Sequence, residues 1–134
     1  MTTRYLLDSN IISDLVRNPQ GAVARRMEAA GEAAVCTSII VAAEIRYGLA
    51  RKNSDALRAK TEPVLARIQI LPLESPFAEA YGGIRADLDR RGLPIGSLDC
   101  LIAAHALATD CVIVTANERE FVRVPGLTVE NWLR

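Results

Sequence analysis

The sequence YLLDSN, residues 5–10, sets the pattern from which the architecture of this chain can be worked out. Residues 5–7 form a short apolar run, which is typical of a strand buried on both faces. Asp8, Ser9 and Asn10 follow directly, and residues of these types are common where a chain turns. The stretch therefore predicts a buried strand whose carboxyl end delivers Asp8 into a turn. Asp8 could also serve there as a turn residue and nothing more.

Working outward, short apolar runs alternate with stretches of helical periodicity. We expect further strands at residues 34–36, 68–73, 111–114 and 127–129. We expect helices at residues 11–16, 21–30, 39–51, 55–67 (kinked or restarted at Pro63), 77–91 and 98–108. The expected helix caps are Thr37 or Ser38, Ser54 or Asp55, and Ser97.

This alternation predicts an α/β fold, a three-layer α/β/α sandwich with a mainly parallel central sheet. Ligand sites in such sheets lie at the carboxyl ends of the strands, where Asp8 and the turn at residues 115–117 are expected. The 134 residues, 50% hydrophobic and 24% charged, fit one domain spanning residues 1–134. The longest apolar runs are too short to cross a bilayer, and the start of the sequence has no signal-peptide core. We therefore expect a cytoplasmic protein that does not bind membranes.

Two acidic residues stand among apolar helical neighbours. Glu44 has Ile40, Val41, Tyr47 and Gly48 at helical spacing. A carboxylate buried there must be protonated, paired with a cation such as Arg85, or bound to a metal ion. Asp99 opens an almost wholly apolar helix, where the helix dipole favours an acid but desolvation disfavours it.

A fourth acid, Glu120, lies three residues after Asn117, which also fits a capping pattern before a helix. A shared role explains the positions of four acids better than separate structural roles do; these acids are Asp8, Glu44, Asp99 and Glu120. Mg²⁺ and Mn²⁺ prefer carboxylate oxygens, and two such ions can stabilise the attacking and the leaving oxygen of a phosphoryl displacement. We therefore predict that these four residues are catalytic and bind Mg²⁺ or Mn²⁺.

Three polar residues near the expected strand ends complete the predicted site. We expect Asn10, Thr115 and Asn117 to orient the carboxylates or a bound water. The net charge of zero does not exclude a nucleic acid substrate. If four of the 16 acids bind metal, 16 − 4 leaves 12 acids against 16 basic residues, so the rest of the chain carries +4.

Other chemistries fit the residue inventory less well. His105 is the only histidine, so a ribonuclease that relies on two imidazoles is excluded, and we expect His105 to pack in the core with one hydrogen bond. The three cysteines, without close spacing, are expected to be free buried thiols. A phosphatase with Asp8 as nucleophile stays open, although the haloacid dehalogenase type has a second aspartate where this chain has Asn10. A catalytically silent binding module is the other alternative.

Four blocks of the sequence resemble a PIN-domain nuclease, and specifically the VapC toxins of bacterial toxin-antitoxin pairs. The blocks are LLDSNIIS (residues 6–13), TSIIVAAEIRYGLA (37–50), IRADLDRRGLPIGSLDCLIAAHAL (84–107) and VTANEREFVRVPGLTVENW (114–132). They cover nearly the whole chain in the family's order. Asp8, Glu44, Asp99 and Glu120 match the family's four acidic positions, with glutamate at 120 where many relatives have aspartate, and Ser9 where threonine is frequent.

The resemblance implies a magnesium- or manganese-dependent endonuclease that cleaves RNA, often tRNA. It also implies a homodimer and a cognate VapB-like antitoxin that occupies the active-site groove. We expect the dimer seam on the apolar faces of the helices at residues 39–51 and 55–67.

Overall fold

A computed structural model describes residues 2–134 of the chain. Its five strands form one parallel sheet in the order β3-β2-β1-β4-β5. The strands are β1 (Arg4–Leu7), β2 (Val35–Ser38), β3 (Gln69–Leu71), β4 (Cys111–Val114) and β5 (Val129–Glu130). The helices are α1 (Ser9–Arg17), α2 (Ala22–Ala30), the 3₁₀ turn η1 (Glu32–Ala34), α3 (Ile39–Lys52), α4 (Asp55–Arg67), α5 (Pro76–Arg90), α6 (Ser97–Ala108) and α7 (Glu118–Phe121).

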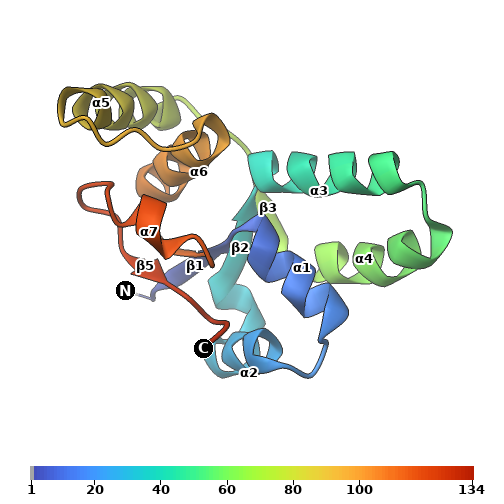
Figure 1. Cartoon of the computed structure of the whole chain (residues 1–134). Coiled ribbons are helices and arrows are strands. Elements are labelled where there is room, and N and C mark those ends of the chain that lie inside the picture. The colour runs from blue at the N-terminus through green and yellow to red at the C-terminus, as the bar shows by residue number, and fades with distance from the viewer. Residues whose placement is uncertain (1) are drawn as a thin grey trace.

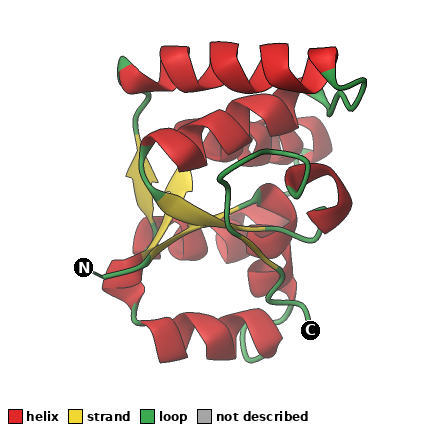
Figure 2. Cartoon of the chain, turned by 90° about the vertical axis from the view of Figure 1, so that its left-hand side faces the viewer, coloured by secondary structure: helices red, strands yellow, loops and turns green. Residues whose placement is uncertain are grey.

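Helices cover both faces of the sheet. α6 packs against β4 and β2, with α5 outside it, while α1 and α2 lie on the opposite face (Figures 1 and 2). α3 and α4 form a hairpin that extends beyond the sheet beside α1 (Figure 1). The predicted three-layer α/β/α sandwich is confirmed, with a sheet that is wholly parallel.

The packing of the core explains why the sequences of the central strands and of α6 are continuous apolar runs. Leu6, Leu7, Ile113 and Val114 on the two central strands are fully buried, because helices cover both faces there. α6 is buried over most of its circumference for the same reason. The edge strand β3 differs, since Ile70 is 37% exposed.

Several predicted boundaries were wrong by a few residues, and for β2 and β3 the local structure explains the shift. The strand expected at 34–36 begins at Val35, because Ala34 closes the 3₁₀ turn. β3 is shorter than the predicted 68–73, since Ile68 caps α4 and Pro72 cannot donate a ladder hydrogen bond. The last strand comprises Val129–Glu130 rather than 127–129.

The capping predictions were right at two of three helices. Ser38 accepts a hydrogen bond from the Ile40 amide and Ser54 accepts one from the Leu57 amide. Ser97 is not a cap, because α6 already begins there and Gly96 occupies the capping position. α4 continues through Pro63, so the restart allowed for at that proline does not occur.

His105 is buried as expected but forms two hydrogen bonds rather than one. Its Nε2 donates to the carbonyl oxygen of Pro72 at 3.1 Å, which leaves Nδ1 to accept from the Ser38 hydroxyl at 2.6 Å. Burial lowers the pKa of His105 below its usual 6.5. The three cysteines are free and buried, as predicted. Within residues 2–134, no helix is both long enough and apolar enough to cross a membrane.

Candidate active site

The four acids predicted to form the site come from four separate elements and meet at the carboxyl edge of the sheet. Asp8 directly follows β1 and caps α1, while Glu44, Asp99 and Glu120 lie on α3, α6 and α7. The charge of Asp8 influences both Glu44 and Asp99, and the Asp99 and Glu120 carboxyls are within hydrogen-bonding reach of each other. The sheet order reverses direction between β1 and β4, and such switch points open a crevice for ligands.

Asp8 is the most buried of the four, with 3% of its surface exposed. Its Oδ1 accepts a hydrogen bond from the Ser9 amide at 2.8 Å, and its Oδ2 accepts one from the Thr115 hydroxyl at 2.8 Å. Burial raises the pKa of Asp8, and the bonds from Thr115, Ser9 and Asn10 partly offset this rise. The carboxylate is therefore held in one orientation at the end of β1.

Asp99 and Glu120 are joined through one amide group. Nδ2 of Asn117 donates to Asp99 Oδ2 at 2.8 Å and to Glu120 Oε2 at 3.0 Å. Burial, the hydrogen bond with Glu120 and the negative charge of Asp8 together raise the pKa of Asp99 to about 7. The same hydrogen bond lowers the pKa of Glu120. The pair can thus hold one proton between two carboxyl groups near neutral pH.

The capping role considered for Glu120 is not formed. Asn117 stands at the start of α7, but its side chain makes no capping hydrogen bond. A capping box would require Glu120 to accept a hydrogen bond from the backbone amide of Asn117, but Glu120 accepts one from the side-chain amide of Asn117 instead. Glu120 therefore faces Asp99 instead of closing its own helix.

Glu44 contains an unpartnered oxygen. Within residues 2–134, its Oε1 is buried and has no hydrogen-bond partner. Burial raises the pKa of Glu44, and the nearby charge of Asp8 adds to the rise. Arg85 does not pair with it, since its guanidinium donates to the Tyr81 hydroxyl at 2.7 Å. The apolar surroundings expected for Glu44 are only partly present, because Tyr47 is 66% exposed.

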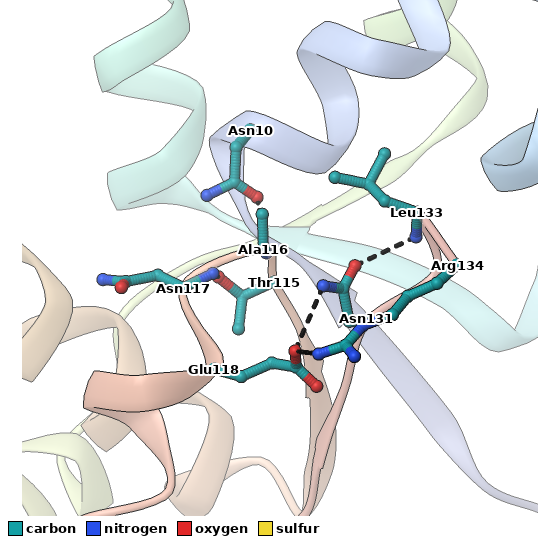
Figure 3. A network of polar contacts seen from close by, with 8 residues as sticks. All are labelled: Asn10, Thr115, Ala116, Asn117, Glu118, Asn131, Leu133 and Arg134. Atoms are coloured by element: carbon teal, nitrogen blue, oxygen red, sulfur yellow. Dashed lines mark hydrogen bonds and ion pairs between the residues drawn. The ribbon is translucent and has the colours of Figure 1, made fainter.

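The loop after β4 is fixed by a polar network (Figure 3). Asn10 Oδ1 accepts from the Ala116 amide at 3.0 Å, and Thr115 Oγ1 accepts from the Asn117 amide at 2.9 Å. Asn10 also reaches Asp8 Oδ2, at a long 3.5 Å. These contacts link the start of α1 to the turn that carries Asn117, whose side-chain amide donates to Asp99 and Glu120.

A fifth acid, Glu118, is turned away from this cluster. Its carboxylate accepts from Asn131 Nδ2 at 3.3 Å and is paired with the Arg134 guanidinium (Figure 3). These partners lower the pKa of Glu118. The sequence contains no local pattern that links Asn131 and Arg134 to Glu118, because they lie 13 and 16 positions away from it.

The donor set suits a hard divalent cation. Within the described residues, no three acidic, histidine or cysteine side chains are already gathered into a complete metal site. However, the buried Glu44 Oε1 has no hydrogen-bond partner in the part of the chain that the structure describes, and three further carboxyls surround the same edge of the sheet. Mg²⁺ keeps several waters and needs only one or two carboxylates directly, so an incomplete protein shell fits its chemistry.

Comparison with known proteins shows the family to which the chain belongs. The PIN domain family model matches residues 5–127. Ribonuclease VapC2 of Rickettsia felis is 35% identical over 130 residues, which cover 96% of this chain and 97% of the relative. The tRNA(fMet)-specific endonuclease VapC of Shigella flexneri is 35% identical over 130 residues, covering 96% of this chain and 98% of the relative.

A solved structure is similar over the same extent. In the VapBC2 complex from Rickettsia felis bound to a DNA fragment from its promoter, one chain superposes with a TM-score of 0.89 at 32% identity. The match covers 97% of this chain and 99% of that one. The chain described here therefore belongs to the PIN-domain family, within its VapC group.

Proposed function

We propose that this protein is a Mg²⁺- or Mn²⁺-dependent RNA endonuclease and the toxin of a toxin-antitoxin pair. The observation that carries the proposal is the convergence of Asp8, Glu44, Asp99 and Glu120 at one edge of the sheet, with Glu44 Oε1 left unpartnered. The names of the relatives, ribonuclease and tRNA(fMet)-specific endonuclease, support RNA as the substrate and tRNA as the class of RNA.

In this proposal Asp8, Glu44, Asp99 and Glu120 hold the cation. When bound, a divalent cation lowers the pKa of a coordinated water and neutralises charge on a phosphodiester. Thr115 keeps the Asp8 carboxylate in its orientation through the 2.8 Å hydrogen bond. Asn117 keeps Asp99 and Glu120 together, so that both carboxyls can face the same cation.

A direct test is incubation of the purified protein with total RNA and Mg²⁺ or Mn²⁺, followed by sequencing of the new ends. We expect cleavage by the wild type, and loss of cleavage by at least about 100-fold in Asp99→Asn and in EDTA. Glu118→Gln is the matched control, because Glu118 is a nearby acid that pairs with Arg134 rather than facing the cluster. Cleavage that survives both Asp99→Asn and EDTA would sink the proposal.

The same assay separates the two alternatives. A silent binding module would leave RNA intact with every ion tested. A phosphatase would instead turn over a phosphomonoester such as p-nitrophenyl phosphate. Asn10 carries an amide, which cannot act as the second acid that a haloacid dehalogenase-type phosphatase uses, and its Oδ1 accepts a hydrogen bond from the Ala116 amide.

We further propose that the chain acts in the cytoplasm as a homodimer and is held inactive by a VapB-like antitoxin. The solved relatives are described as VapBC complexes, which supports an antitoxin partner. On α3, Ile39 is 44% exposed and Tyr47 66%, so apolar surface remains for a second copy. Light scattering should give the mass of a dimer at micromolar concentration, and Tyr47→Arg should shift it toward the monomer.

A further inference from the structure

A groove opens from the carboxylate cluster along α1 and α3. Its volume is about 350 Å³, and residues of α1, α3 and α4 line it. Ser9 and Glu44 lie at the end shared with the cluster. Eight residues further along each helix, a rise of about 12 Å, Arg17 and Lys52 line the same groove. The groove is therefore continuous with the proposed cleavage site and ends in two cations.

The two cations are exposed and free to bind an anion. Among the ion pairs and hydrogen bonds of residues 2–134, none involves the side chain of Arg17 or Lys52. Other surface arginines do find acidic partners, such as Arg46 with Glu62 and Arg67 with Glu32. The far end of the groove thus carries uncompensated positive charge.

The middle of the groove is apolar and open. Ile12, Val16, Leu49 and Leu57 contribute to its lining. Gly48 lies among them, and a Cβ added there would meet no atom within 4 Å. A side chain at this position would project into free space, so the absence of one keeps the groove open between its acidic and basic ends.

We propose that this groove binds one nucleotide of the RNA strand next to the phosphodiester held at the carboxylate cluster. Its phosphate is contacted by Arg17 and Lys52, and its base lies against the apolar lining. The inference rests on the proposed ribonuclease function and adds a substrate-positioning site to it. The volume of the groove is at the small end of the range for ligand pockets, which suits one nucleotide. The positive charge at its far end favours a ligand that carries a phosphate over an apolar peptide without acidic residues.

The test measures binding without cleavage. A short fluorescein-labelled single-stranded RNA is titrated with protein in EDTA, and its anisotropy is followed at several salt concentrations. For Arg17→Ala/Lys52→Ala, we expect about tenfold weaker binding, and a slope of log K against log salt that is shallower by about 0.7, because one phosphate of the strand is no longer neutralised. For Gly48→Leu, we expect weaker binding with an unchanged slope, because it fills the base site and removes no charge.

Matched controls come from the same chain. Lys60→Ala/Arg90→Ala removes one lysine and one arginine that are exposed, lie outside the groove and form no ion pair among the described residues. Gly82→Leu adds the same side chain at an open helical glycine of α5. Both controls should bind RNA as the wild type does.

Two results would overturn the inference. The first is that the groove variants bind RNA with the same affinity and the same salt slope as the control variants. This result is expected if the groove binds only a protein partner. The other is a wild type that does not bind the RNA at all. Because no divalent ion is present, the outcome is separable from cleavage: groove-dependent binding without cleavage refutes the proposed reaction alone, and cleavage with groove-independent binding refutes the groove alone.

Discussion

The hydroxyl of Thr115 donates a 2.8 Å hydrogen bond to Oδ2 of Asp8, although the two residues are 107 positions apart in the chain. Both are buried, at the ends of the adjacent parallel strands β4 and β1. The same Thr115 oxygen accepts from the Asn117 amide, which ties the Asp8 carboxylate to the loop that positions Asp99 and Glu120. One buried hydroxyl therefore couples both halves of the candidate site.

Replacing this hydroxyl should cost both stability and activity. Thr115→Val removes the 2.8 Å hydrogen bond to the buried Asp8 Oδ2 and leaves the Asn117 amide without its acceptor, so we expect the free energy of unfolding to fall by about 1–3 kcal/mol. Urea denaturation measures this loss, and RNA cleavage should fall with it. Thr115→Ser retains the hydroxyl and serves as the control. Equal stability of the valine and serine variants would show that the hydrogen bond contributes little.

Glu44 should show a trade-off between stability and activity. Its carboxylate has an orphan buried oxygen and a pKa raised by burial and by Asp8. Glu44→Gln removes the charge and the repulsion, so the metal-free protein should gain on the order of 1 kcal/mol in stability. Cleavage of RNA should fall at the same time. A Glu44→Gln protein that is less stable than wild type in EDTA would contradict this account of the site.

His105 should make stability depend on pH below neutrality. Because burial lowers its pKa in the folded chain, the unfolded state takes up the proton first as the pH falls. The contribution of a neutral His105 is complete above pH 6.5 and is lost as the pH falls from there toward the lowered folded pKa.

The comparison with His105→Gln isolates this effect from the acids. Urea denaturation measures the free energy of unfolding of both proteins between pH 7.5 and 5, the pH range in which histidine titrates. The advantage of the wild type over His105→Gln should be largest at pH 7.5 and shrink on acidification. A difference that stays constant with pH would mean that His105 titrates alike in the folded and unfolded states.

The thiols of Cys36 and Cys111 should stay reduced even though their sulfurs are 3.8 Å apart. Cys36 is on β2 and Cys111 on β4, with β1 between them. Two strand spacings amount to about 9–10 Å, beyond the roughly 7 Å between Cα atoms that a disulfide tolerates. Mass spectrometry after mild oxidation of the folded protein should show no loss of two hydrogens, whereas an intramolecular disulfide at native stability would refute the argument.

Much of the fold followed from local pattern. Strands that helices cover on both faces have continuous apolar sequences, and this pattern predicted where β1 and β4 lie. Helical periodicity located every long helix, because burying one face leaves a trace every three or four residues. Asp8 could be placed at a strand tip on the same grounds. The boundary errors at Ala34, Ile68 and Ser97 arose where a 3₁₀ turn or a neighbouring cap, rather than hydrophobicity, ends an element.

What only the tertiary structure decided is how the acids are held. The sequence alone could nominate Asp8, Glu44, Asp99 and Glu120, since each stands out against its neighbours or matches a family position. It could not tell that Asn117 bridges two of them, that Glu118 is paired with Arg134, or that Glu44 Oε1 has no hydrogen-bond partner among residues 2–134. Such contacts join residues far apart in the chain, and a hydrogen bond depends on positions in space that only the assembled sheet and its helices set.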